Sequence, residues 1–500
     1  MRVDGLGPRT FSAPRYNVLV GLLFVLGTPI SPQVLSAQPM TVHQAIAKAL
    51  AHNQTVLYGA RLNMLNAATQ RQSADAAYRP SLSIRLNASR SGSITQIPGM
   101  ENVQDYRYQQ LYPDLDVRQT ILTPFGSKVS ISGAVQTMLT GFNSLTYQTL
   151  PTLGLSYEQP LSWAGIVAGH ADIVQADLAL ENSRRSFRLQ QEQLVLSVLQ
   201  SYFQLWQSTR TVEQSINDEE SARRILEIAE VKLRSGTIAE FEVLNLRVQR
   251  RLAEDNLLQV RNLSKTQTIS FMRLLGEAVD SSFKLTEHFK VDSLNVSLDS
   301  AVAGALMNRM ELKQARDALT LARLNRGVVS SAISPVFGLN LSYNLRSNME
   351  STFFRSLAMP NYGWGISGSI TIPLLDGGQT ALQTESADRS IAIQEMNIKL
   401  LEEEIRIEVE TRYRTLQLNF RRMGSLELSL ASAAEALKIA ELRFQSGEIS
   451  STEIENVRNR HNASRNALDG VRISHVLERA ALAKAMGGLM DWVESLKGTE

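Results

Sequence analysis

Residues 229–238 read Ala-Glu-Val-Lys-Leu-Arg-Ser-Gly-Thr-Ile, and residues 440–449 read Ala-Glu-Leu-Arg-Phe-Gln-Ser-Gly-Glu-Ile, 211 positions later. Upstream of each stretch, apolar residues recur mostly every seven positions and keep the same offset. A seven-residue apolar period is typical of coiled-coil helices, and an internal repeat is the first evidence of architecture. The first ladder contains Leu180, Phe187, Leu194, Val198, Leu205, Val212, Leu226 and Leu233, and the second contains Ile391, Ile398, Ile405, Val409, Leu416, Met423, Leu430, Leu437 and Phe444.

Both copies follow one order: a first helix, a β region, a long heptad helix, a glycine turn and a second helix. Each first helix is predicted to run for about 38 residues, or roughly 57 Å, and each long helix for about 75 residues, or roughly 110 Å if unbroken. The predicted divisions are a first repeat over 38–276, a linker over 277–296, a second repeat over 297–487 and a C-terminal tail over 488–500.

Capping residues mark the expected helix starts. Thr41 stands three positions before Gln44, and Ser297 is placed to cap the first helix of the second repeat. Two more stretches have capping-box spacing just after the glycine turns, Thr237 to Glu240 and Ser450 to Glu453.

In the β regions the apolar period changes to two. Residues 337–345 and 362–372 alternate apolar with small or polar side chains, and so do residues around 82–86 and 153–157. Strands of about ten residues with one apolar face have the length of tilted membrane strands. A half-buried strand of a soluble sandwich is the alternative.

The first repeat holds about 42 more residues between its prolines than the second, and these contain a hairpin of their own at about 91–150. Alternating apolar positions flank a turn at residues 123–127. The predicted number of strands is therefore about four per chain, or six if this hairpin joins the same sheet as the other strands. The sequence leaves both arrangements open.

The N-terminus is predicted to be a secretory signal peptide over 1–37. Three arginines precede an apolar run at about 18–26, which is too short to span a bilayer, and small residues follow it. Cleavage after Ser36 and cleavage after Ala37 fit equally well. No later stretch has the roughly twenty apolar residues that an inner-membrane helix needs, so the exported chain is expected in the periplasm, outside the cell or in the outer membrane.

Composition excludes several functions. The 51 basic and 49 acidic residues become 48 of each without residues 1–37, so no basic excess favours nucleic acid. There is no cysteine for a disulfide or lipid anchor. The six histidines lack metal-ligand spacing, and no catalytic or phosphate-binding motif occurs. We therefore predict no enzyme, no metal site and no cofactor.

An open sheet with an apolar face cannot lie in lipid, because its unpaired edges would cost several kcal/mol per group. One chain has too few strands to close a barrel of about eight strands. Several copies can pool their strands, and helices longer than a membrane is thick would then continue below them. The sequence predicts an oligomeric tube with a β end in the outer membrane.

These features resemble the TolC family of outer-membrane factors, and the resemblance covers essentially the whole chain after residue 37. It rests on the stretch 308–312 (Asn-Arg-Met-Glu-Leu), on the strand-to-helix corners 159–161 and 372–378, and on the twice-used glycine-turn pattern with its following acid. The resemblance implies a homotrimeric outer-membrane β-barrel of about 12 strands, continued by a periplasmic α-helical coiled-coil barrel. With the added hairpin the count would be about 18.

The resemblance also implies site residues. Gly236 and Gly447 are the tip turns where a periplasmic adaptor (membrane fusion) protein docks, with Leu233 and Phe444 one turn before them. Glu242 and Glu453 occupy the acidic positions of the aperture. Capping alone is the competing interpretation of Glu453. The charged segment 402–412 is expected to be a solvated helix face or, alternatively, tunnel lining.

The function implied is a passive exit duct for a tripartite efflux pump or type I secretion system, gated at the helical tip. Its implied partners are the adaptor, an inner-membrane transporter and outer-membrane lipid. The rival is a periplasmic coiled-coil adaptor or scaffold. The sequence does not identify the cargo.

Overall fold

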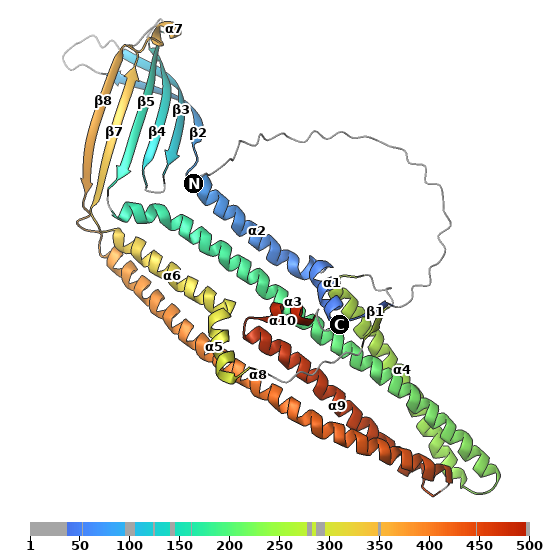
Figure 1. Cartoon of the computed structure of the whole chain (residues 1–500). Helices are drawn as coiled ribbons and strands as arrows, with labels where there is room; N and C mark the ends of the chain where they lie inside the picture. The colour runs from blue at the N-terminus through green and yellow to red at the C-terminus, as the bar shows by residue number, and fades with distance from the viewer. Residues whose placement is uncertain are drawn as a thin grey trace, which may run out of the picture.

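The computed structural model describes residues 38–496 except 53, 96–105, 124–125, 141–145, 162, 278–282, 287–295, 349–351 and 447. The predicted signal peptide therefore lies outside the described residues. The chain is elongated, with a β-sheet at one end and the turns of two helical hairpins at the other (Figure 1). The first hairpin is α3 (Trp163–Arg234) with α4 (Glu240–Leu275), and the second is α8 (Gln379–Ser446) with α9 (Ser451–Ala485).

The apolar ladders hold the long helices against their neighbours. Leu194 and Val198 of α3 are at most 2% exposed, as are Val409 and Leu416 of α8. They belong to two separate clusters: the α3 residues pack with α1 (Val42–His52), α4 and parts of α9 and α10 (Leu489–Leu496), and the α8 residues pack with α5 (Leu298–Asn308), α6 (Met310–Ser331) and the end of α9. Because a buried position recurs every two turns, each long helix keeps one apolar stripe toward these neighbours.

The predicted first helix of the second repeat is broken into two pieces, and in the first repeat two helices flank residue 53, which lies outside the described residues. In the first repeat they are α1 (Val42–His52) and α2 (Gln54–Ala76), and in the second α5 (Leu298–Asn308) and α6 (Met310–Ser331). Arg309 is the break in the second repeat, because its ψ of 127° is extended and cannot continue a helix.

The predicted caps of the first helices are confirmed. Thr41 and Gln44 bond reciprocally, each backbone N–H donating to the other's side chain at 3.2 Å. The Ser297 hydroxyl accepts from the Ser300 N–H at 3.2 Å. These bonds satisfy N–H groups that have no partner inside the helix.

A small parallel sheet ties the start of the first repeat to the linker. It pairs β1 (Gln38–Met40) with β6 (Phe283–Leu285). Tyr202 of α3 is 1% exposed beneath it and donates to the Met40 carbonyl at 2.9 Å and the Thr286 carbonyl at 3.0 Å. The linker is thereby fixed to the middle of α3. The C-terminal tail contains a further helix, α10 (Leu489–Leu496).

The main sheet has six strands in consecutive antiparallel order. Of the two strand counts that the sequence left open, six is therefore the one observed, and four is wrong. They are β2 (Ser81–Thr95), β3 (Tyr106–Leu122), β4 (Lys128–Thr140), β5 (Thr146–Pro160), β7 (Val336–Arg346) and β8 (Asn361–Thr371). The added hairpin is β3 and β4, which pair with β2 and β5 on either side. It enters the sheet because its period-two pattern matches that of its neighbours.

None of the helices in the described part of the chain combines the length and the apolar character of a membrane-spanning helix.

Candidate functional site

The register of the sheet gathers apolar side chains on one face and polar side chains on the other. One row that crosses all six strands consists of Leu82, Gln119, Ile131, Leu155, Tyr343 and Trp364, and the next consists of Ile84, Val117, Gly133, Leu153, Leu345 and Tyr362. The alternate rows hold Ser83, Arg118, Ser132, Gly154, Asn344 and Gly363, and Arg85, Asp116, Ala134, Thr152, Arg346 and Asn361. A single curved wall therefore separates an apolar side from a polar side.

None of the residues that the structure describes covers the apolar face. The sheet stands clear of the long helices (Figure 1), and Trp364 is 72% and Ile84 65% exposed. Exposed apolar patches of this extent are rare in soluble monomers. The outermost strands, β2 and β8, also have no strand beside their outer edges in the described chain. The wall needs both an apolar surrounding and further strands.

At the opposite end, the glycine turn of the first hairpin ends α3 in a left-handed cap. Gly236 has a φ of +72°, its N–H bonds the Leu233 carbonyl at 2.9 Å, and the Thr237 N–H bonds the Lys232 carbonyl at 2.9 Å. This is the Schellman arrangement, which favours glycine because a side chain is strained at positive φ.

The turn of the second hairpin keeps one equivalent bond, from the Glu448 N–H to the Arg443 carbonyl at 2.9 Å. Gly447 itself lies outside the described residues.

The structure brings Leu233 and Phe444 together. Both pack against an apolar cluster of the first hairpin, formed by Ile225, Leu226, Ala229, Val243 and Leu246. The Lys232 ammonium lies 5.9 Å from the centre of the Phe444 ring, within reach of a cation–π interaction. Phe444 of α8 is thus seated on the hairpin of the other repeat, and the two tips are joined inside one chain.

Glu242 and Glu453 both lie in the first turns of the helices that leave the tip, α4 and α9, and both are exposed. The Ser450 hydroxyl accepts from the Glu453 N–H at 3.3 Å, so Ser450 caps α9 as predicted. The other predicted box is wrong, because Ala239 is the N-cap of α4 and makes no side-chain bond. Thr237 instead donates to the Lys232 carbonyl of the preceding turn at 2.9 Å.

A polar cavity of about 420 Å³ lies between the two hairpins above their tips. Its walls come from α3, α8 and α9. The Arg458 guanidinium donates to the Ser221 hydroxyl and lies 3.9 Å from Glu441, and Asn462 donates to Asp218 at 3.5 Å. The contacts with Ser221 and Asp218 connect α9 to α3, and the sequence gives no sign of them because the partners are more than 200 positions apart.

Burial shifts the pKa values of two carboxyl groups near Arg458. Burial raises the pKa of Asp218, although the Arg458 charge and the Asn462 hydrogen bond oppose the shift. Burial also raises the pKa of Glu455, which Arg458 opposes and Asp218 reinforces. One arginine therefore balances two half-buried carboxylates across the junction of the hairpins.

The charged segment 402–412 has an exposed face, which includes Glu403 and Glu404, and a second side that forms ion pairs with neighbouring helices. Glu402 bonds Arg316 at 3.4 Å, Glu408 bonds Arg309 at 2.5 Å, and Arg412 bonds both oxygens of Glu478 at 3.1 and 3.0 Å. Arg309, Arg316 and Arg323 recur every seven positions, and that spacing was a usable sign of these ion pairs.

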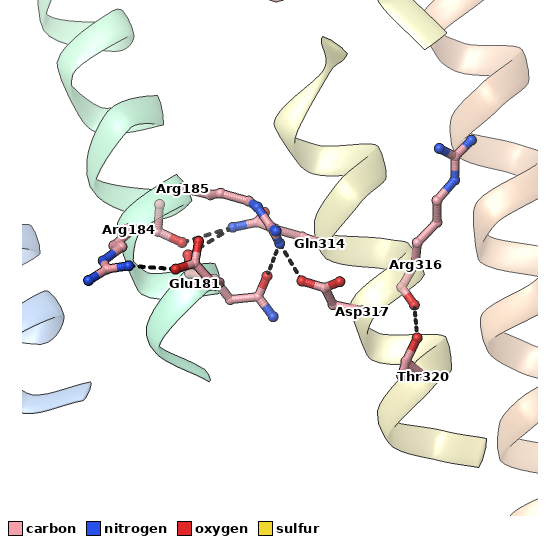
Figure 2. A network of polar contacts seen from close by, with 9 residues as sticks. Glu181, Arg184, Arg185, Gln314, Arg316, Asp317 and Thr320 are labelled. Atoms are coloured by element: carbon pink, nitrogen blue, oxygen red, sulfur yellow. Dashed lines mark hydrogen bonds and ion pairs between the residues drawn. The ribbon is translucent and has the colours of Figure 1, made fainter. Parts of the chain in front are cut away.

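A second polar network joins the two repeats in the N-terminal part of α3, nearer the sheet. Figure 2 shows Arg185 of α3 reaching Asp317 of α6, with Gln314 donating to the Asn182 carbonyl at 3.2 Å and to the Ser186 hydroxyl at 3.0 Å. The first repeat thus meets the second through hydrogen bonds and an ion pair. Among the described residues, no group of His, Cys, Asp and Glu could hold a metal ion.

Residues 302–488 match the family model described as outer membrane efflux protein. No curated protein sequence matches the chain. Among solved structures, the outer membrane protein VceC of Vibrio cholerae is similar at a TM-score of 0.66 and 18% identity, over 89% of this chain and 96% of that one.

Two further solved structures share the fold. The CmeC outer membrane channel of Campylobacter jejuni is similar at a TM-score of 0.67 and 14% identity, over 95% and 94% of the two chains. The open state of the MtrE outer membrane channel of Neisseria gonorrhoeae is similar at 0.61 and 16%, over 91% and 90%. Residues 302–488 thus match the outer membrane efflux protein model, and the chain has, along about nine-tenths of its length, the fold of the TolC-family outer-membrane channels.

Proposed function

We propose that this chain is one subunit of an outer-membrane exit duct, in which three copies close their sheets into one barrel and their helices into a tunnel below it. The observation that carries the proposal is the six-stranded wall with its exposed apolar face. Such a wall is stable in lipid only when its edges are paired. Three copies with six strands each give a barrel of about 18 strands, wide enough for an aqueous channel.

The helices extend this duct beyond the membrane. The 72 residues of α3 span roughly 108 Å, more than three times the thickness of a bilayer core. A helical end of this length lies in the periplasm, where an adaptor protein and an inner-membrane transporter supply cargo and energy. The duct serves an efflux pump or a type I secretion system as a passive conduit.

Gating is proposed at the helical tip. Phe444 joins the second hairpin to the first, and opening requires this contact to separate. Glu242 and Glu453 lie beside the tip as acidic residues of the aperture, Glu453 also standing at a capped helix start. Gly236 and Gly447 with Leu233 and Phe444 form the surface for the adaptor.

Planar-bilayer recording of the purified protein tests the proposal. We expect stepwise conductance that Phe444→Ala increases by weakening the closed tip, whereas Phe241→Ala, which removes a 70% exposed aromatic of α4, leaves closure intact. Membrane fractionation separates the proposal from the rival adaptor, which would be water-soluble without detergent. A chain that is soluble and never conducts overturns the proposal.

A further inference from the structure

The polar face of the sheet has a band of arginines near the end that bears α7 (Phe353–Ser356) (Figure 1). Arg85 of β2 and Arg346 of β7 belong to one row of the register, and Arg118 of β3 belongs to the next row. All three residues are exposed. We propose that they form an anion-binding belt inside the barrel, where solutes that carry carboxylate or phosphate groups are favoured. This inference rests on the proposed function, because the polar face lines a lumen only when copies close into a barrel.

Within the two rows of the belt, acids are fewer than arginines. The Arg118 guanidinium lies 3.9 Å from the Asp116 carboxylate, which also stands opposite Arg85 in the register. Neither Arg85 nor Arg346 forms an ion pair with any residue that the structure describes. One carboxylate therefore stands against three guanidinium groups, and two positive charges per copy have no counter-charge in the belt.

The rest of the polar face does not cancel this excess. Beyond the next row toward the helices, Lys128 and Glu158 face each other at 3.6 Å and balance. On the other side of the belt, Asp114 stands opposite Asn87 and Gln136 in the register. Over the paired strands of the described chain, this face thus keeps one more cation than acid in each copy. The uncharged row between the belt and the balanced pair consists of Ser81, Thr120, Ser130, Ser156, Ser342 and Gly365.

The neighbours of the arginines are small, so the belt is open to solutes. Gly154, Gly363, Ser132 and Ala134 belong to the same two rows. A Cβ added at Gly363 would have open space around it. Arginine offers five donors in a planar fork that fits the two oxygens of a carboxylate or phosphate. Accessible guanidinium groups around an aqueous lumen are therefore suited to bind these groups.

The proposed duct carries opposite charges at its two ends. Glu242 and Glu453 are exposed beside the tip, whereas the belt lies in the sheet at the other end of the molecule (Figure 1). Rings of carboxylates favour cations, and rings of arginines favour anions. The selectivity of the whole channel therefore reports both ends in series, and only a change between variants isolates the belt.

Reversal potentials in planar bilayers under a potassium chloride gradient test the belt. The double variant Arg85→Gln with Arg346→Gln removes the two unpaired charges and is expected to lower the permeability ratio of chloride to potassium at least about twofold. The change should be largest near about 0.01 M salt, where the Debye length is roughly 30 Å, and small near about 1 M, where it is roughly 3 Å.

The double variant Lys128→Gln with Glu158→Gln is the matched control. It also removes two charged groups from the polar face, but these groups form a balanced pair. Because the net charge of the face does not change, the permeability ratio should stay at the wild-type value.

Block by added anions tests the guanidinium groups themselves. Pyrophosphate and succinate, each added on the side of the sheet, are expected to reduce the wild-type current at low salt, and the stronger blocker identifies the group that the belt prefers. Arg85→Lys with Arg346→Lys keeps both charges but loses the planar fork. This variant should keep the permeability ratio and require at least about threefold more of either anion for half block.

The outcomes separate the belt from the duct. A channel that conducts with the same permeability ratio in the wild type and the glutamine variant, or with an equal change in the Lys128–Glu158 control, overturns the belt but not the duct. Equal block of the wild-type and lysine channels overturns binding by the guanidinium fork. A chain that never conducts overturns the duct, and the belt with it.

Discussion

The Nε of Arg326 lies 3.0 Å from Oδ1 of Asp388, and this ion pair is the last rung of a ladder that joins α6 to α8. Arg323 bonds Glu395 at 2.9 Å on the rung before it. The rungs formed by Arg316 and Arg309 complete the series toward the middle of the molecule. The arginines ascend in sequence (309, 316, 323 and 326) while their acids descend (408, 402, 395 and 388), so the ladder fixes the relative register of the two antiparallel helices.

The rungs should differ in their contribution to stability. The Arg309 side chain is 13% exposed and the Arg326 side chain 47% exposed. Burial alone would lower the pKa of Arg309, but its bonds to Glu408 and Glu311 keep the pKa above its ordinary value. We expect Arg309→Ala to cost about 2–4 kcal/mol, because it leaves carboxylates without their partner, and Arg326→Ala less than about 1 kcal/mol.

Thermal unfolding of both variants, followed by circular dichroism in detergent, checks this difference. A pair exchange, Arg309→Glu with Glu408→Arg, should recover part of the loss. Equal losses at the two rungs would show that burial does not set their strength.

Glu192 of α3 is expected to destabilise the protein when it is charged. Its residue is 2% exposed, and one of its carboxylate oxygens has no hydrogen-bond partner. Burial raises its pKa above 4.5, with Arg188 opposing the shift and Glu311 adding to it. A raised carboxyl pKa means that the folded chain binds the proton more tightly than the unfolded chain, so this contribution to stability is lost as pH rises through the raised pKa.

Glu192→Gln should therefore raise the unfolding temperature at neutral pH, corresponding to about 1 kcal/mol. The gain should shrink as the pH falls toward 4.5, where the wild-type carboxyl is itself protonated. Glu192→Ala serves as the control for lost packing, and an equal gain from both variants at every pH would contradict the electrostatic explanation.

The sequence predicted the features that depend on local period. The heptad ladders gave the hairpins, and the alternation of residues such as Phe337 and Leu339 gave the strands. It did not predict the break at Arg309, because nothing local distinguishes an extended ψ there from a helical one. The break coincides with ion pairs from Arg309 to Glu311 and to Glu408, which lies 99 positions away, and only the folded chain brings these groups together.

The candidate site was predictable in part for the same reason. The glycine turn at Gly236 and the cap at Ser450 are local and could be read from the sequence. The seating of Phe444 on the other hairpin and the contact of Arg458 with α3 depend on tertiary packing. The place of β3 and β4 in the sheet stayed open because a period of two describes a strand without naming its neighbour.

A side chain at the glycine of the first tip should destabilise the turn. Gly236 has a φ of +72°, at which an L-residue is strained. Gly236→Ala is expected to destabilise the end of α3 by about 1 kcal/mol. Gly327→Ala is the matched control: Gly327 lies inside α6 with open space around it, and the change should stabilise the helix by about 0.5–1 kcal/mol. Hydrogen exchange of the backbone amides near each site measures both, and a loss at Gly327 would contradict the argument.

Arg458 should control the pH response of the junction between the hairpins. It faces Asp218, Glu441 and Glu455, and burial raises the pKa of both Asp218 and Glu455. Their favourable contribution is complete below the ordinary carboxyl pKa and is lost as pH rises through the raised values. Without the arginine, both pKa values should rise further, and at neutral pH two uncompensated carboxylates would oppose each other.

Arg458→Ala is therefore expected to weaken the contact of α9 with α3 by about 1–3 kcal/mol at neutral pH and by much less at a pH where the acids are protonated. Hydrogen exchange of the amides of residues 451–465, compared between variant and wild type at each pH, measures this. Arg465→Ala removes another arginine that lines the same cavity and should have the smaller effect. Two results would contradict this explanation: equal behaviour of the two variants, or an Arg458→Ala effect that persists at acidic pH. Either result would show that packing holds the junction and that the charge balance between Arg458 and the two acids does not determine its stability.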